Sequence, residues 1–494
     1  MHRAFRFLAI GLALLAASCG RGNEGALEMA IIGEEGDPFE EGVLLSAAGQ
    51  HVRAATVEGL VGLDAQGQVI PALADRWIVT DDGRSYIFRL REGTWPDGSE
   101  LTGESARTAL RTVVRQLSGR PLGRDIDQIE EIRAMAGRVV EIRLKGAMPD
   151  FLQLLAQPEL GLAHKGRGTG PMSLRRVDGI AVLAMLPPQQ RGLPVDERWQ
   201  GNVRELRLRS LPAARAAELF YEGVVDVVLN GRIEDLPRVD TGPLSRGTVR
   251  IDPAIGLFGL AVRRAEGVLA DAAGREAVSM AIDREALVAP FNIGGWTPTT
   301  RIVAPGLPAD LGTIGERWDA MPLDARRAAA ASRIAAWRAE NGRAENEGEA
   351  PEILIALPAG PGGDTLFRRL SQDMAAIGIT LRRAKEGEEP ALELVDRVAR
   401  YANARWFLGQ FHCGLRRGLC SSAADERLAE ANAAADPAER AALLAEAEAE
   451  LTGANAFIPF GQPIRWSLVR AGIEGFSANP WVFHPLPQLA TIPR

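Results

Sequence analysis

Residues 59–104 read GLVGLDAQGQVIPALADRWIVTDDGRSYIFRLREGTWPDGSELTGE. Apolar and polar side chains alternate over residues 85–91, and this period predicts a strand with one buried face. An Asp-Gly pair precedes that strand as a hairpin turn, so residues 76–79 are expected to form its partner. Thr102 stands where it can cap a helix whose apolar residues recur at helical spacing. The stretch therefore predicts a hairpin followed by a helix.

Two further segments repeat a strand-helix-strand pattern. In one of them, residues 203–209 and 224–229 have strand character and flank a helical pattern that ends at Gly223. Glycine is the usual residue at a left-handed helix stop. The other segment runs from residue 352 to residue 383. Alternation of this kind predicts a mixed α/β fold.

Composition limits the classes of function. The chain has 494 residues, of which 46% are hydrophobic and 24% charged, which is ordinary for a globular protein of two or three domains. A net charge of −7 argues against nucleic acid as a partner. Its five histidines are scattered without metal-ligand spacing, and no G-x-S-x-G motif is present. We therefore expect neither an enzyme nor a protein that holds a metal or another cofactor.

The N-terminus has the layout of a secretory signal. Arg3 and Arg6 precede an apolar run over residues 7–17, which is too short to span a membrane. The following Cys19 completes an Ala-Ala-Ser-Cys sequence that resembles a bacterial lipobox, although that motif prefers leucine where alanine opens it here. Residues 1–19 are thus predicted to be a lipoprotein signal peptide, with Cys19 acylated. The alternative is plain secretion with Cys19 unmodified.

The other two cysteines are Cys413 and Cys420. If Cys19 carries lipid, an exported protein leaves this pair free to form a disulfide. Such a bond would close a short loop and stabilise the fold by roughly 2 kcal/mol. A metal site that also includes His412 is the competing interpretation, but no further histidine or cysteine lies nearby in the sequence.

The stretch 59–104 resembles the signature of the family 5 extracellular solute-binding proteins. Residues 275–285, REAVSMAIDRE, resemble a second motif of that family, and shorter matches occur at residues 168–171 and 458–460. This resemblance implies a two-lobed α/β periplasmic binding protein fold of type II, in the large peptide-binding cluster. The implied divisions are lobe I at residues 20–258, with a small extra subdomain at about 60–165, lobe II at 259–465, and a return to lobe I at 466–494. The two crossovers between the lobes are expected near residues 255–262 and 459–466.

The resemblance also implies a function. Members of the family are substrate-binding components of ABC importers that capture a peptide or similar small solute and deliver it to a membrane permease. This chain is accordingly expected to be a monomer in the periplasm, anchored to a membrane by lipid. An alternative is a lipoprotein of the same fold that serves as an interaction or sensor module. The aromatic content of only 5% keeps that alternative open, because clefts in the family are usually rich in aromatic residues.

Ligand contacts are expected in the cleft between the lobes. Peptide binders of the family often meet the ligand's amino group with an aspartate in a D-Y-x-x-P step, and here Arg400 takes the place of the aspartate in Arg-Tyr-Ala-Asn-Ala. If Arg400 faces the cleft, an anionic ligand becomes favoured; otherwise Arg400 is a surface residue. Aromatic side chains are candidates for the walls, and two glutamates follow the first strand. The predicted ligand-binding residues are Glu34, Glu35, Trp296, Arg400, Tyr401, Trp406 and Trp466.

Overall fold

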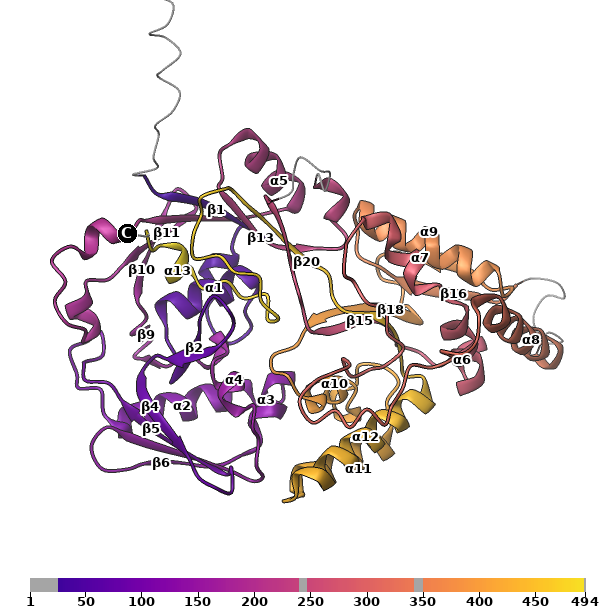
Figure 1. Ribbon diagram of the computed structural model, residues 1–494, viewed down its shortest axis with the longest axis horizontal. Helices are drawn as coiled ribbons and strands as arrows, with labels where there is room; N and C mark the ends of the chain where they lie inside the picture. Colours follow the sequence, from indigo (N-terminus) through magenta and orange to yellow (C-terminus); the bar gives the residue numbers. More distant parts are fainter. Residues whose placement is uncertain (1–24, 240–246, 342–349, 493–494) are drawn as a thin grey trace, which may run out of the picture.

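A computed structural model describes residues 25–239, 247–341 and 350–492 (Figure 1). Two β-sheets organise these residues into two lobes, and the last segment of the chain, through α13 (Leu486–Leu489), lies against the first lobe. The predicted signal segment and Cys19 lie outside the described residues. Within the described ranges, no helix combines the length and apolar character needed to cross a bilayer.

The sheet of lobe I contains seven of the described strands. Their order is β10 (Met172–Val177), β11 (Ile180–Met185), β12 (Leu206–Leu211), β1 (Leu27–Ile32), β13 (Val227–Arg232), β20 (Arg465–Val469) and β14 (Val249–Asp252). The predicted strand-helix-strand unit is confirmed as β12, α5 (Ala213–Glu222) and β13. Gly223 ends α5 with φ +82°, a left-handed conformation that suits glycine. However, β1 lies between β12 and β13 and pairs with both in parallel.

Five of the described strands form the sheet of lobe II. Their order is β17 (Thr380–Arg383), β16 (Glu352–Ala356), β18 (Leu392–Val398), β15 (Gly256–Val262) and β19 (Phe457–Gly461). The second predicted unit is confirmed as β16, α9 (Pro361–Ala375) and β17, whose two strands pair in parallel. The helices of this lobe are α6 (Ala272–Ala281), α7 (Arg284–Val288), α8 (Leu323–Asn341), α10 (Ala404–Gly409), α11 (Ser422–Ala433) and α12 (Pro437–Ala454).

The quoted stretch forms the centre of a subdomain. The predicted hairpin is β4 (Ala74–Val79) and β5 (Ser85–Leu90), and β7 (Val139–Leu144) and β6 (Ile129–Ala134) extend it to four strands. Thr102 caps α2 (Gly103–Leu117) by accepting the backbone N–H of Ser105, whose hydroxyl accepts the N–H of Thr102 in return. The buried face of β5 packs on α2 within one apolar core. The remaining elements of the subdomain are β2 (Val61–Leu63), β3 (Val69–Pro71), α3 (Pro121–Ile126) and α4 (Phe151–Leu155).

Two short connections join the lobes in the described chain. The chain leaves the first sheet after β14 and enters the second at β15, so that residues 253–255 form one connection. It returns between β19 and β20 through residues 462–464. The boundaries expected at residues 258 and 465 therefore fall at or a few residues inside the strands that follow the connections. β15 is an unbroken apolar run, so no polar residue in the sequence marks where it begins, and β20 begins at Arg465, which is buried although it is charged.

Candidate ligand-binding cleft

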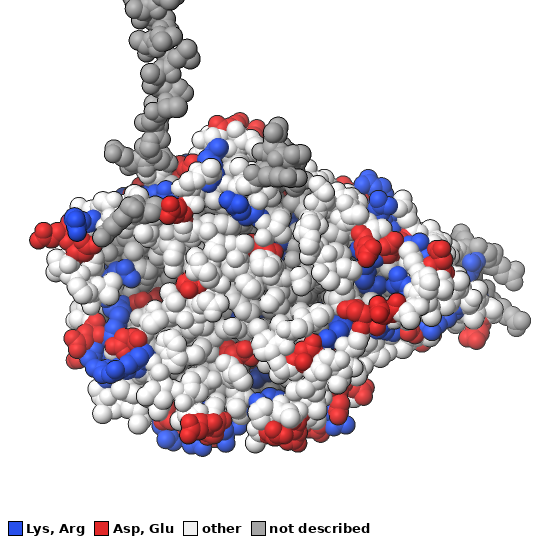
Figure 2. Space-filling view, in the orientation of Figure 1, with Lys and Arg blue, Asp and Glu red and all other residues white. Residues whose placement is uncertain are grey.

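A cavity of about 440 Å³ lies between the lobes. Lobe I lines it with the start of α1 (Ala47–Thr56), with α3, with the 3₁₀ turn Pro158–Leu160 and with residues 481–483. Lobe II contributes residues 396–400 at the end of β18 and two side chains near α10. On the face drawn in Figure 2, charged side chains gather mainly towards the periphery, and the central region carries few of them.

The N-terminus of α1 places two side chains in the cleft. Ser46 caps the helix by accepting the N–H of Gly49 at 3.1 Å, and this fixes Gln50 and His51 in the first turns. The His51 ring stacks on Phe483 with ring centroids 4.7 Å apart. Burial lowers the pKa of His51 to about 4, so the imidazole is neutral near pH 7.

Arg400 crosses the cleft from lobe II to lobe I. Its guanidinium donates to Oε1 of Glu159 and to Oε1 of Gln157, each at 2.9 Å, and to Oε1 of Gln50 at 3.3 Å. The side chain of Glu159 is only 5% exposed, and its Oε2 has no hydrogen-bond partner among the described residues. Of the two alternatives that the sequence left open for Arg400, the structure has the one in which it lines the cavity, but its charge is paired with a carboxylate of the opposite lobe.

A second contact joins the lobes beneath the cavity floor. The Tyr401 hydroxyl donates to Oδ1 of Asp125 on α3 at 2.7 Å, and Tyr401 is fully buried. Burial raises the pKa of Asp125 to about 6, against the opposing effect of Arg405. Tyr401 does not line the cleft, contrary to the expectation for it, because its ring belongs to the core and its hydroxyl is engaged.

Polar contacts continue along the loop that follows Arg400. The Asn403 amide donates to Asp150 at 3.0 Å, and the backbone N–H of Ala402 donates to the Gln153 side chain at 3.2 Å. Gln157 also donates to the carbonyl of Arg400 at 2.9 Å. The subdomain therefore docks on lobe II through side chains of residues 125–159 and the loop at 400–403.

The other end of the cavity is basic. Nη1 of Arg465 donates to both carboxylate oxygens of Asp396, each at 2.8 Å, and both side chains are nearly buried. Arg397 donates to the Gln410 side chain at 3.1 Å, and Arg232 lines the cavity from β13. A second cavity of about 350 Å³ adjoins this end and shares Arg232, Asp396 and Arg397. Sequence reasoning missed these arginines, because arginine supplies nearly all the positive charge of the chain and no motif distinguishes them.

Of the predicted ligand-binding residues, Arg400 and Trp406 line the cavity. Trp466 is instead 1% exposed, packs on Gly231 in the core and donates its Nε1–H to the carbonyl of Arg232 at 2.8 Å. Trp296 packs on the lobe II core and donates to the carbonyl of Gln462 at 2.8 Å.

Glu34 and Glu35 are also placed outside the cavity. Both are exposed in the turn after β1, where the backbone N–H of Glu34 is bound by Asp37. The aromatic walls come partly from the C-terminal return instead, as Trp481 and Phe483. Their position depends on a strand that returns from the far lobe, which no local pattern predicts.

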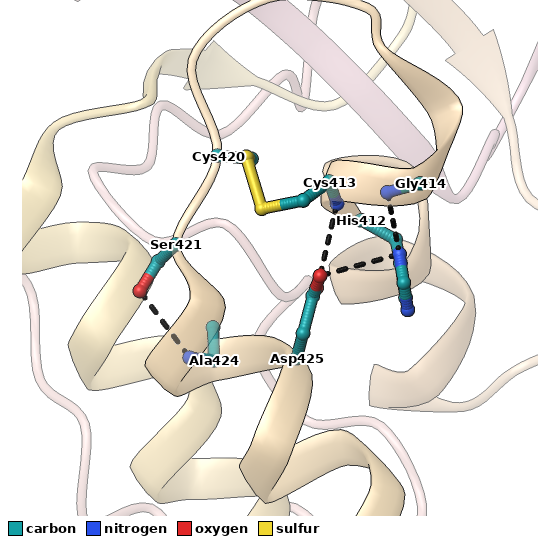
Figure 3. The surroundings of a disulfide bond; sticks show 7 residues. All are labelled: His412, Cys413, Gly414, Cys420, Ser421, Ala424 and Asp425. Atoms are coloured by element: carbon teal, nitrogen blue, oxygen red, sulfur yellow. Dashed lines mark hydrogen bonds and ion pairs between the residues drawn. A yellow bond between two sulfur atoms is a disulfide. The ribbon is translucent and has the colours of Figure 1, made fainter.

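Cys413 and Cys420 are joined by a disulfide, with Cα atoms 5.2 Å apart (Figure 3). Asp425 on α11 accepts the backbone N–H of Cys413 at 3.0 Å and lies 3.2 Å from Nδ1 of His412. Since the two sulfurs are bonded to each other, they are not ligands for a metal. The loop between them carries Arg417 and reaches β15, where Leu419 donates to the carbonyl of Val262 at 2.8 Å.

Two α/β lobes, two connections and a cavity between the lobes define the class of periplasmic binding proteins. The chain belongs to the bacterial extracellular solute-binding proteins, family 5, whose profile matches residues 68–393. Its fold is similar to that of Haemophilus influenzae OppA in complex with the peptide RPPGFSPFR, with a TM-score of 0.77, 16% identity, and coverage of 94% of this chain and 99% of that one. The murein tripeptide binding protein MppA of Escherichia coli gives a TM-score of 0.76 at 17% identity, over 95% and 98% of the two chains. The predicted family and fold class are therefore confirmed.

Similarity to sequence relatives is more local. The glutathione-binding protein GsiB of Escherichia coli O6:K15:H31 is 25% identical over 294 residues, which cover 55% of this chain and 54% of GsiB. The probable deoxycholate-binding periplasmic protein YgiS of Escherichia coli K12 is 33% identical over 121 residues, or 21% of this chain and 23% of YgiS. The chain thus matches about half the length of these relatives, or less.

Proposed function

We propose that this protein is the substrate-binding component of an ABC importer, which captures a peptide or similar small solute and delivers it to a membrane permease. The observation that carries the proposal is the cavity of about 440 Å³ whose walls come from both lobes. A solute that contacts both walls stabilises the closed arrangement over the open one, and closure is the signal a permease can read. The similar proteins support a small solute of this kind: OppA is in complex with the peptide RPPGFSPFR, MppA is named for a murein tripeptide, and GsiB is named for glutathione.

Location is part of the same proposal. A periplasmic protein held at a membrane by lipid on Cys19, and acting as a monomer, agrees with the lipobox-like sequence and with the family. Mass spectrometry of the membrane-extracted protein tests this directly, because acylation adds the mass of the lipid to a chain that begins at Cys19. A Cys19→Ala variant should be released into the soluble fraction, and an unmodified cysteine in the wild type would contradict the anchor.

Thermal melting of the form that lacks residues 1–19 tests the proposed function. The panel comprises di- to hexapeptides, small dicarboxylates, nickel complexes and oligosaccharides. Saturation at about one hundred times Kd should add roughly 2.7 kcal/mol to the free energy of unfolding. Gln50→Trp, which fills the cavity, should abolish the shift, whereas Gln66→Trp, at an exposed position away from the cavity, should leave it intact.

A second candidate is an interaction or sensor module on the same fold. Arg400 favours it, because the guanidinium bridges the lobes through Glu159 and Gln157 and its charge is thereby paired with a carboxylate of the protein. The same melting panel separates the two functions. A shift with one class of solute supports the receptor, whereas silence across the panel together with capture of a protein partner by the wild type, but not by Gln50→Trp, would support the module.

A further inference from the structure

Three arginines of lobe II lie together beside the cleft. Arg263, Arg397 and Arg417 line one small pocket, and Arg263 donates both to the backbone carbonyl of Arg417 and, at 2.6 Å, to Glu393. Burial together with the charges of Arg417 and Arg263 lowers the pKa of Arg397 to about 10. One guanidinium nitrogen of Arg417 is buried without a hydrogen-bond partner among the described residues. Three positive groups therefore share one carboxylate, which is already bound.

Arg232 approaches the same place from lobe I. It lines both the main cavity and the adjoining one, and Arg397 does the same from the opposite lobe. The positive charges that line these two spaces thus come from both lobes, as a site that closes around a ligand requires.

The carboxylates of the region do not balance these charges. The adjoining cavity is lined by Arg232, Arg263 and Arg397 and by Glu234, Glu393 and Asp396, whereas Arg465 lines the main cavity and Arg417 only the small pocket. Asp396 is held by Arg465 and Glu393 by Arg263. Burial raises the pKa of Glu234. Among the described residues, neither Arg232 nor Arg397 therefore forms an ion pair with a carboxylate, and Arg397 donates to the Gln410 side chain instead.

Gathering like charges in a partly buried place costs stability, and such arrangements are found where a ligand compensates for them. Elsewhere in the cleft, Arg400 has its own carboxylate in Glu159 and is not available in this arrangement. Guanidinium groups bind carboxylate and phosphate oxygens through paired N–H donors.

We propose that the solute carries an oxyanion, either a carboxylate or a phosphate, that is held between Arg232 and Arg397 where the two cavities meet. This inference rests on the proposed function and specifies the class of solute. The remainder of the solute lies in the main cavity, against Trp406 and the aromatic side chains of residues 481–483.

Isothermal titration calorimetry on the form lacking residues 1–19 tests the inference. Succinate and citrate probe a carboxylate, pyrophosphate and phosphoserine probe a phosphate, and succinamide is the uncharged match of succinate. The oxyanion class that binds the wild type should lose about tenfold or more in affinity to Arg397→Gln and to Arg232→Gln. Arg369→Gln, on the exposed side of α9, is the matched control and should bind as the wild type does.

A second readout separates ligand binding from a structural role. Without solute, Arg397→Gln should melt at the same temperature as the wild type or higher, because the substitution relieves repulsion from Arg263 and Arg417. A structural arginine would instead lower Tm.

Equal binding of oxyanions to the wild type and Arg397→Gln, or binding of no oxyanion, overturns the inference. In the second case, stabilisation by a C-terminally amidated peptide without acidic side chains, or by a neutral sugar, would leave the proposed function standing. Stabilisation by no solute of either kind would overturn both.

Discussion

Arg400 and Glu159 form an ion pair between side chains of different lobes, and the carboxylate is the more buried partner, at 5% exposure against 30%. Arg400→Gln leaves that carboxylate without its cation, which should lower the free energy of unfolding by about 2 kcal/mol. The double variant Arg400→Gln/Glu159→Gln removes both charges and should recover most of the loss. Urea unfolding of the wild type, both single variants and the double variant completes the cycle. If the double variant loses the sum of the free energies lost by the two single variants, the pair does not couple the lobes.

Asp125 gives the cleft a dependence on pH. Its carboxyl group has a pKa of about 6 in the folded protein against 3.8 as the ordinary value, so the folded state holds the proton more tightly. Its contribution to stability is therefore complete below about pH 4 and lost as the pH rises through 6. Asp125→Asn cannot lose a proton at this position. From pH 4 to pH 7 its free energy of unfolding should therefore rise by about 3 kcal/mol relative to that of the wild type.

Urea unfolding at pH 4 and pH 7 measures this difference. The exposed Asp81→Asn, in the turn between β4 and β5, serves as the control, since its side chain lies in solvent and does not contribute to the shift at Asp125. A constant difference between Asp125→Asn and the wild type at both pH values would contradict the prediction.

Single residues were the least predictable part of the site. Arg400 was identified because it replaces an acid in a recognisable step, and a motif carries that information in sequence. The sequence did not distinguish Trp466 and Trp296, which pack in the core, from residues that line the cavity, because tryptophan suits a core and a cavity equally well. Arg232 and Arg397 carry no local signal, because they meet only where strands of different lobes end.

At the scale of elements, local chemistry was a sufficient guide. The Asp-Gly turn, the cap at Thr102 and the glycine stop at Gly223 each depend on a few neighbouring residues, and the structure has all three. The order of the strands in the sheet could not be predicted from local sequence. The insertion of β1 between β12 and β13 is decided by packing across almost two hundred residues of chain.

The disulfide loop is an element whose contribution can be isolated. Cys413→Ala/Cys420→Ala should lower the free energy of unfolding by about 2 kcal/mol, because the unfolded chain regains the freedom of a loop with a sequence separation of 7. Urea unfolding checks the value. Dithiothreitol should shift the urea midpoint of the wild type to that of the variant and leave the midpoint of the variant unchanged. An equal shift of both midpoints would show that the effect does not come from this disulfide.

For the whole molecule, the family resemblance predicted two lobes and two crossovers, and the sheets have that arrangement. The relative position of the lobes could not be predicted, because it depends on pairs such as Asn403 and Asp150 that are distant in sequence.

Loss of these ties should open the molecule. Arg400→Gln/Asn403→Ala removes two side chains that hold the loop at 400–403 to the subdomain, and the variant is measured in the absence of solute. The covalent links between the two sheets in the described chain, residues 253–255 and 462–464, are the same in the variant and the wild type. The radius of gyration of the variant from small-angle X-ray scattering should exceed that of the wild type. Arg369→Gln should scatter as the wild type does. An unchanged radius would show that the remaining contacts, such as that of Tyr401 with Asp125, keep the lobes together.

The ion pair between Arg400 and Glu159 also bears on the rate at which a bound solute leaves the cavity. A solute enclosed in the cavity leaves when the lobes part, and the ion pair has to break in the same motion. We therefore expect the dwell time of the cargo to depend partly on a pair of side chains that bind each other. Under the proposed function, such a pair would hold a weakly bound solute for longer before the protein meets a permease, and it would also slow the release of that solute.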